Sequence, residues 1–192
     1  MKASCKLANE DDEITNLVAM NYPGGLVLET ACGQGRLRDK FDSYIGIDLP
    51  DSHHATTHSV NVLANAQQLP FKPKTFDFAF TVAALMLFTD PGMACREVWR
   101  CLRPGGKYLI IDYTPDTKRT LTRRALENNR NISFTIWDDR QIKDLLHNSG
   151  FDHVKRIYPS WKSHILGILG LSKLVNKKDC LMVYIAKKST SG

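Results

Sequence analysis

Residues 28–37 read Leu-Glu-Thr-Ala-Cys-Gly-Gln-Gly-Arg-Leu, an apolar run that turns into a segment of small residues. The run over 26–29 predicts a buried strand, and residues 36–41 read as a helix that follows the turn. The alanine and the two glycines of the turn let the backbone bend tightly and let a ligand approach closely. The first turn of such a helix would present free N–H groups to a carboxylate or a phosphate. The stretch therefore predicts a ligand site between the first strand and the first helix.

The dinucleotide fingerprint G-x-G-x-x-G does not fit this turn. Its first glycine would fall on Ala31 and its third on Arg36, which disfavours a nicotinamide-dependent dehydrogenase. Cys32 lies in the same turn, but the sequence places no His or Lys beside it to activate the thiol. We therefore interpret Cys32 as a small packing residue rather than a nucleophile.

Outward from this turn, short apolar runs alternate with helical stretches along the chain. Runs that predict strands are 26–29, 44–48, 59–63, 76–82, 108–112, 151–158 and 181–185, and helical stretches are 9–20, 36–41, 91–102 and 138–148. Nearly continuous apolar strands are typical of a parallel sheet that is covered on both faces. With right-handed crossovers, the pattern predicts an α/β fold: a doubly wound, mostly parallel seven-stranded sheet with helices on both faces. Ligands of such sheets bind at the carboxyl ends of the strands.

Length and composition favour one soluble domain. The chain has 192 residues, of which 43% are hydrophobic and 24% are charged, close to the average of globular domains. Its five cysteines are scattered without a C-x-x-C pair, which argues against a disulfide framework and favours a reducing compartment. The longest apolar run, 165–171, is far shorter than the ~20 residues of a membrane span. Because no signal-peptide pattern is visible at the N-terminus, we expect a cytoplasmic protein.

The net charge of +6 comes from the second half of the chain. Residues 155–192 carry eight basic side chains and one acidic side chain, and residues 113–130 are also basic. Binding to nucleic acid or to another anionic surface is one explanation. A solvated lysine-rich edge is the other, and the sequence leaves both open.

Four further motifs follow the turn in order. Gly46-Ile47-Asp48 ends the second strand, where an acidic side chain can accept two hydrogen bonds from a ribose diol. The others read Asn65-Ala66-Gln67-Gln68-Leu69-Pro70-Phe71, Phe76-Asp77 and Arg100-Cys101-Leu102-Arg103-Pro104-Gly105-Gly106. Together with residues 29–35, these motifs resemble those of the class I S-adenosylmethionine-dependent methyltransferases, in the broad small-molecule branch. The resemblance covers about residues 26–112, and 136–154 also looks like the last helix and strand of that family.

This resemblance implies S-adenosylmethionine as cofactor and S-adenosylhomocysteine as product. It implies that the methionine part faces the glycine turn, that Asp48 holds the ribose hydroxyls and that Leu49 packs on the adenine. Asn65 and the backbone N–H of Ala66 would contact the adenine edge, and the end of the fourth strand would lie near the methyl group. The residues implied at the cofactor are Glu29, Thr30, Ala31, Cys32, Gly33, Gly35, Arg36, Asp48, Leu49, Asn65, Ala66, Thr81 and Val82.

Two residues depart from the family pattern. Ala31 stands at the usual first glycine, and we expect it to be tolerated if its φ is negative. Asn65 stands at the usual aspartate, where an amide oxygen still accepts a hydrogen bond from the adenine amine but without charge assistance. The two departures leave open a non-catalytic binding module with a degenerate cofactor site.

The sequence predicts no single catalytic residue and no metal site. Methyl transfer requires an acceptor atom held ~3–3.5 Å from the methyl carbon, and a general base only where the acceptor must lose a proton early. Candidates for such a base are Asp112, Tyr113 and His164. The histidines at 53, 54 and 58 fall in a polar stretch and read as solvated side chains rather than metal ligands.

These inferences predict one methyltransferase domain over residues 1–192. Its cofactor-binding core spans about 24–112, and two substrate-side segments span about 113–135 and 159–178. The expected activity is transfer of a methyl group from S-adenosylmethionine, by in-line displacement, to an unidentified acceptor that we expect to be a small molecule. An RNA-directed methyltransferase that uses the basic C-terminal half is the remaining alternative. The oligomeric state is left open.

Overall fold

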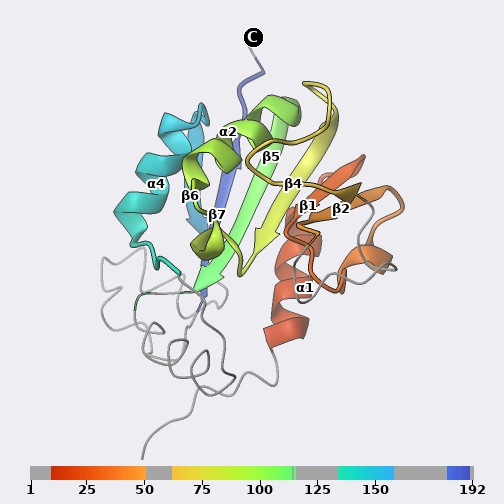
Figure 1. Cartoon of the computed structure of the whole chain (residues 1–192), viewed down its shortest axis with the longest axis horizontal. Coiled ribbons are helices and arrows are strands. Elements are labelled where there is room, and N and C mark those ends of the chain that lie inside the picture. The colour runs from red at the N-terminus through yellow and green to blue at the C-terminus, as the bar shows by residue number, and fades with distance from the viewer. Residues whose placement is uncertain (1–9, 51–61, 114, 116–133, 158–180, 191–192) are drawn as a thin grey trace, which may run out of the picture.

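The computed structural model of the chain describes residues 10–50, 62–113, 115, 134–157 and 181–190 (Figure 1). Strands form a central sheet, and helices lie against it on both sides. None of the helices described is long and apolar enough to cross a membrane.

Seven strands form one sheet in the order β3-β2-β1-β4-β5-β7-β6. The first five strands of the chain run parallel to one another, and β7 lies antiparallel to both β5 and β6. The bounds are β1 Val27–Thr30, β2 Tyr44–Asp48, β3 Val62–Leu63, β4 Phe76–Val82, β5 Leu102–Tyr113, β6 His153–Ile157 and β7 Leu181–Lys187. The predicted doubly wound, mostly parallel seven-stranded sheet is therefore confirmed.

Helices cover both faces of this sheet. α1 (Glu10–Asn21) packs on one face, and α2 (Pro91–Cys101) and α4 (Asp139–Asn148) pack on the other (Figure 1). The start of α4 is a capping box in which Asp138 accepts from the N–H of Gln141 at 2.8 Å and Gln141 accepts from the N–H of Asp138 at 2.9 Å. This arrangement satisfies two N–H groups at the helix start, and it confirms the helix that the sequence predicts to begin here.

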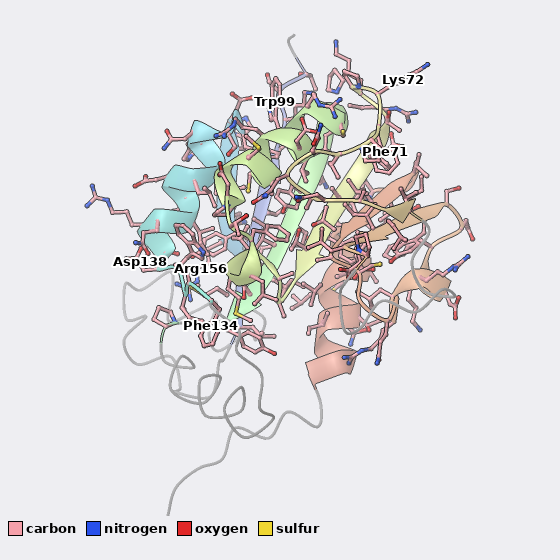
Figure 2. The ribbon with its side chains drawn as sticks, viewed as in Figure 1. Phe71, Lys72, Trp99, Phe134, Asp138 and Arg156 are labelled. Carbon is pink, nitrogen blue, oxygen red and sulfur yellow. The ribbon has the colours of Figure 1, made fainter. Side chains whose placement is uncertain are left out.

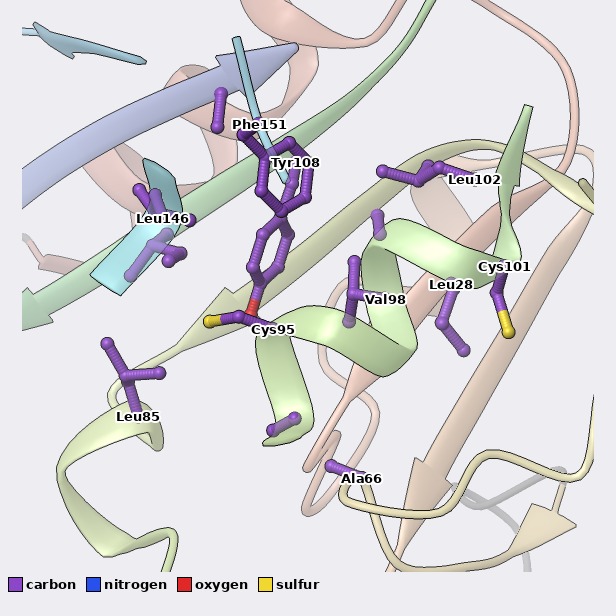
Figure 3. Packing of buried hydrophobic residues seen from close by; sticks show 14 of the residues in the cluster. Leu28, Ala66, Leu85, Cys95, Val98, Cys101, Leu102, Tyr108, Leu146 and Phe151 are labelled. Carbon is purple, nitrogen blue, oxygen red and sulfur yellow. The ribbon is translucent and has the colours of Figure 1, made fainter. Parts of the chain in front are cut away.

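The core consists of two layers, one on each face of the sheet. Figure 3 shows part of the layer between the sheet and the helices α2 and α4, which includes Cys95, Val98, Tyr108 and Leu146. The opposite layer, beneath α1, includes Phe80 of β4. β1 and β4 are buried on both faces, which explains why their sequences read as nearly continuous apolar runs.

Arg100 and Glu97 connect α2 to the loop that precedes β4. Arg100 donates to the carbonyls of Leu69 at 3.0 Å and Phe71 at 2.8 Å, and it pairs with Glu97 at 2.7 Å. Glu97 in turn accepts from the N–H of Leu69 at 2.8 Å. Figure 2 shows Phe71 at the end of the molecule that lies away from Phe134. Because the donors of Arg100 are used inside the fold, these bonds give the residue a structural role.

The predicted helix over residues 36–41 is wrong. The structure has a loop there, followed by one turn of 3₁₀ helix, η2 (Arg38–Lys40). Thirteen residues separate β1 from β2, and the glycine turn uses about half of them, which leaves too few for an α-helix with its two connections. Within these described residues no α-helix follows the turn, so the expected anion site at a helix N-terminus is wrong as well.

Two further boundaries differ from the sequence-based expectation. β5 begins at Leu102 instead of residue 108, because residues 103–106 form a bulge between the pairs Phe76↔Leu102 and Phe78↔Lys107. Gly105 allows this bulge with φ +80°. The residues 59–61 of the third predicted strand, the segment 159–178, nearly all of 113–135 and the histidines at 53, 54, 58 and 164 lie outside the described residues.

Candidate functional site

The glycine turn, residues 31–37, lies at the carboxyl ends of β1 and β2. The N–H of Cys32 donates to the carbonyl of Ile47 at 2.9 Å, and the N–H of Gly35 donates to the carbonyl of Cys32 at 2.8 Å. The first bond holds the turn against the end of β2, and the second closes the turn on itself. The turn is thus placed at the edge of the sheet where parallel α/β folds bind their ligands.

Ala31 adopts a left-handed backbone conformation, with φ +56°. Gly33 and Gly35 do the same, with φ +53° and +64°. The negative φ on which we expect the tolerance of Ala31 to depend is therefore absent. A left-handed conformation brings the Cβ of an L-residue against the following carbonyl oxygen, at a cost of roughly 1–2 kcal/mol. The alanine is strained where a glycine would not be.

Ala31→Gly should therefore raise the free energy of unfolding by about 1 kcal/mol, because the relief of strain exceeds the added entropy of the unfolded chain. Urea unfolding followed by circular dichroism measures the change. Ala94→Gly is the matched control: Ala94 is buried within α2, and glycine there should lower the free energy of unfolding by about 1 kcal/mol. A lower stability of Ala31→Gly would contradict the left-handed conformation.

Asp48 joins the end of β2 to the glycine turn. Its Oδ2 accepts from the N–H of Gly33 at 2.7 Å, and its Oδ1 accepts from the N–H of Leu49 at 2.7 Å. The residue is 8% exposed, whereas the neighbouring Leu49 is 49% exposed. The structure thus places Asp48, which is predicted to hold the ribose, and Leu49, which is predicted to pack on the adenine, next to the turn.

Glu29 is a buried carboxyl group beneath the turn, 5% exposed. The hydroxyl of Tyr44 donates to its Oε2 at 2.5 Å. Burial raises the pKa of Glu29 to about 8; the hydrogen bond from Tyr44 and the charge of Arg36 oppose this rise, and the charge of Asp48 adds to it. Glu29 is therefore a group whose charge changes near neutral pH.

Cys32 packs in the same cluster and is buried. Burial, with the nearby charges of Glu29 and Asp48, raises the pKa of its thiol to about 12. A thiol in such surroundings stays protonated and unreactive. The interpretation of Cys32 as a packing residue agrees with this geometry.

Asn65 and Ala66 form a turn that hydrogen bonds bring to the end of β2. The N–H of Ala64 donates to the carbonyl of Asp48 at 2.9 Å. The side-chain oxygen of Asn65 accepts from the N–H of Gln67 at 2.9 Å and keeps a second lone pair. Asn65 is exposed and Ala66 is buried, so the side chain of the first remains accessible to a ligand.

Thr30 and Thr81 lie side by side at the ends of β1 and β4. Their hydroxyls share a hydrogen bond, and the hydroxyl of Thr81 also pairs with that of Tyr108 at 2.7 Å. Both threonines are fully buried, so their hydroxyls serve the interior of the sheet. Val82, the next residue of β4, is only half-buried and lies at the strand end where the methyl group is expected.

Asp112 lies at the end of β5 and is buried. It accepts from the N–H of Tyr113 at 2.8 Å and from the N–H of Met86 at 3.1 Å. Burial raises the pKa of Asp112 to about 6, against the effect of these bonds and of one from Leu85. The carboxyl group thereby holds η3 (Leu85–Leu87) against β5. Among the described residues no group of His, Cys, Asp and Glu side chains could hold a metal ion.

Tyr44 is the site residue that the sequence analysis misses. It appears there only as part of an apolar strand, without a role. Strand register supplies the missing signal, because Val27 pairs with Tyr44 and Glu29 pairs with Gly46. Tyr44 and Glu29 therefore share one face of the sheet, which no motif in the sequence indicates.

Comparison with known proteins identifies relatives of this chain. Residues 28–110 match the family described as a methyltransferase domain. The chain is 32% identical to the ubiquinone/menaquinone biosynthesis C-methyltransferase UbiE of Shewanella frigidimarina, over 57% of this chain and 51% of that protein. It is also 32% identical to UbiE of Proteus mirabilis, over 77% of this chain and 72% of that protein. The chain thus spans about half the length of several curated relatives that it matches.

A solved structure shares the fold over nearly the whole chain. It is an S-adenosylmethionine-dependent methyltransferase of Thermotoga maritima, described as a possible histamine N-methyltransferase. The TM-score is 0.67 at 22% identity, and the match covers 95% of this chain and 92% of that chain. At this identity the likeness shows the fold, and it agrees with the seven-stranded sheet.

Proposed function

The chain belongs to the class I S-adenosylmethionine-dependent methyltransferases, and from this membership we propose that it transfers a methyl group from S-adenosylmethionine to a small-molecule acceptor. One observation carries the proposal: Asp48, the buried Glu29 and the left-handed glycine turn meet at the carboxyl ends of β1 and β2. When bound, S-adenosylmethionine would supply a methyl group on a sulfonium: the acceptor atom would bond to the methyl carbon as the carbon–sulfur bond breaks, and S-adenosylhomocysteine would be the leaving group.

The residues present fit this cofactor. A nucleoside with an amino-acid tail offers a ribose diol and an ammonium group as donors, and a carboxylate as acceptor. Each carboxyl oxygen of Asp48 accepts one backbone N–H and keeps a lone pair for a ribose hydroxyl. Glu29 offers a carboxylate to the ammonium group, and the exposed Arg36 offers a cation to the tail carboxylate.

The adenine end has partners of the right chemistry as well. Leu49 exposes an apolar side chain beside Asp48, which suits the face of a purine ring. Asn65 keeps an acceptor for the exocyclic amine, and the backbone N–H of Ala66 is proposed to contact the same edge of the ring. With Glu29, Thr30, Ala31, Cys32, Gly33 and Gly35 around the tail, and Thr81 and Val82 at the end of β4, these residues make up the proposed cofactor site.

The acceptor is proposed to be a small apolar molecule. The matched relatives are named C-methyltransferases of ubiquinone and menaquinone biosynthesis, which supports an acceptor of this size. In this chain, Val82 and Tyr113 are half-buried and Leu87 is 46% exposed at the ends of β4 and β5. Apolar side chains at this edge favour a ligand that they can shield from water.

Asp112 is proposed to order η3 rather than to act as a general base. Its two oxygens already accept N–H groups from Tyr113 and Met86. A base must lie within hydrogen-bond reach of the acceptor's proton, whereas Asp112 is only 3% exposed and these bonds hold its carboxyl group between β5 and η3. The catalytic work that remains for the chain is to hold the acceptor in line and to exclude water.

Isothermal titration calorimetry with S-adenosylmethionine and S-adenosylhomocysteine tests the cofactor site. We expect binding of both at micromolar concentrations, and absence of heat at high micromolar cofactor would contradict the proposal. Transfer of a radiolabelled methyl group to fractions of a cell extract then identifies the acceptor. Binding without transfer favours a non-catalytic module, and label in RNA favours the RNA-directed alternative.

Fractionation of cells checks the proposed cytoplasmic location, and limited proteolysis checks the proposed single domain.

A further inference from the structure

Tyr44 and Gly46 of β2 lie on the same face of the sheet as Glu29 of β1. Glu29 pairs directly with Gly46, and Tyr44 is two residues earlier on β2. Side chains two apart on a strand point to the same face. The tyrosine reaches the glutamate diagonally, with its hydroxyl next to position 46.

Gly46 leaves the space through which Tyr44 reaches Glu29. A Cβ at this position would lie 2.6 Å from the hydroxyl of Tyr44 and 2.9 Å from the Sγ of Cys32. Side-chain atoms do not approach that closely, so any larger residue would displace the hydroxyl or the thiol. The glycine of the Gly46-Ile47-Asp48 motif thus serves the contact between Tyr44 and Glu29.

The contact leaves one oxygen of Glu29 for another partner. Tyr44 donates to Oε2 at 2.5 Å, and a carboxylate has a second oxygen with its own lone pairs. Glu29 is buried, and the groups that face it are Tyr44, Cys32, Asp48 and Arg36. Desolvation, with the charge of Asp48, outweighs the stabilisation that Tyr44 and Arg36 give the carboxylate, so an additional cation would be strongly favoured there.

We propose that Tyr44 is a positioning residue for the cofactor: its hydroxyl holds the Glu29 carboxyl group so that the second oxygen receives the ammonium group of the methionine part. This inference rests on the proposed function. It assigns to Tyr44 and Gly46 a role in recognising the amino-acid tail, as distinct from the nucleoside. The ribose and the adenine depend on Asp48 and on residues beyond it, which Tyr44 does not contact.

Two ligands separate the tail from the nucleoside. S-Adenosylhomocysteine carries the tail, whereas 5′-methylthioadenosine has the same nucleoside without it. Tyr44→Phe should raise the dissociation constant of S-adenosylhomocysteine about tenfold, the value of one charge-assisted hydrogen bond, and leave that of methylthioadenosine unchanged. Titration calorimetry of both ligands measures this difference. Tyr22→Phe is the matched control, because the hydroxyl of Tyr22 donates to the carbonyl of Gly25 at 2.7 Å, away from the turn.

The pH dependence of binding gives a second readout. The hydrogen bond from Tyr44 lowers the pKa of Glu29, so its removal should raise that pKa. The loss of S-adenosylhomocysteine binding on acidification should therefore begin at higher pH in Tyr44→Phe than in the unchanged protein. A tyrosine that only packs would leave this midpoint where it is.

Gly46→Ala provides an independent variant if Tyr44→Phe does not fold. It keeps both Tyr44 and Glu29 and displaces the hydroxyl, so it should also weaken S-adenosylhomocysteine selectively. Equal loss of both ligands, or no loss of either, would overturn the inference. If the unchanged protein binds neither ligand, the proposed function itself fails, and this outcome is distinct from the other two.

Discussion

Asp48→Asn should weaken binding of S-adenosylhomocysteine about 100-fold, since two charge-assisted hydrogen bonds are each worth about 1.5–3 kcal/mol. The charge that the ribose hydroxyls would share is lost. In addition, both carboxyl oxygens accept backbone N–H groups, from Gly33 and from Leu49. An asparagine must turn its NH₂ group toward one of these donors, which leaves two donors facing each other and loosens the glycine turn.

Titration calorimetry with S-adenosylhomocysteine and with 5′-methylthioadenosine checks this prediction. Both ligands carry the ribose, so Asp48→Asn should weaken both, in contrast to Tyr44→Phe. Asp42→Asn is the matched control, since Asp42 is exposed ahead of β2. The thermal midpoint of each variant separates a lost ligand contact from a lost fold. Unchanged affinity for both ligands in a folded Asp48→Asn protein would remove Asp48 from the site.

The sheet could be predicted from sequence because its central strands are buried on both faces. β1 and β4 carry no exposed residue, so each reads as a nearly continuous apolar run with a clear end. The position of Asp48 follows from the same logic, as the last residue of such a run. These features depend on local pattern alone, which a single sequence contains.

The glycine turn shows where local pattern is insufficient. Residues 36–41 contain good helix formers, yet the short connection between β1 and β2 leaves room only for η2. Tertiary geometry overrides propensity at this point. The sign of φ at Ala31 is set in the same way, because the bond from Cys32 to Ile47 determines how the chain leaves β1.

The partnership of Tyr44 with Glu29 depends on strand register, which a single sequence does not reveal. A shift of one residue between β1 and β2 would place the two side chains on opposite faces. The pKa of Glu29 depends on the same register, since burial of its carboxyl group is the main cause of the rise. The raised pKa of Glu29 is therefore a property of the packed sheet and not of the local sequence.

Glu29→Gln should make the protein without ligand more stable at pH 8, by roughly 4 kcal/mol. The pKa of Glu29 rises from about 4.5 in the unfolded chain to about 8 in the folded protein. Between these values the folded protein holds a proton that the unfolded chain has released, so stability falls as pH rises through this range. Asp112, with its pKa raised to about 6, adds a similar fall only below that pH. Of these two carboxyl groups, mainly Glu29 titrates between pH 6 and pH 8, so thermal unfolding of the unchanged protein and of Glu29→Gln over this range shows how much of the fall Glu29 causes.

The same variant should bind S-adenosylhomocysteine more weakly, by roughly 10- to 100-fold at pH 8, because a neutral amide replaces the carboxylate that faces the ammonium group. Glu29→Gln should thus raise stability and weaken ligand binding, as expected where a buried ionisable group destabilises the fold but binds the ligand. Asp112→Asn is the control: it should make the fall below pH 6 shallower, where both groups contribute, and leave the fall between pH 6 and pH 8. A flat profile between pH 6 and pH 8 in the unchanged protein would show that Glu29 is not the titrating group. Unchanged binding by Glu29→Gln would show that the ammonium group lies elsewhere.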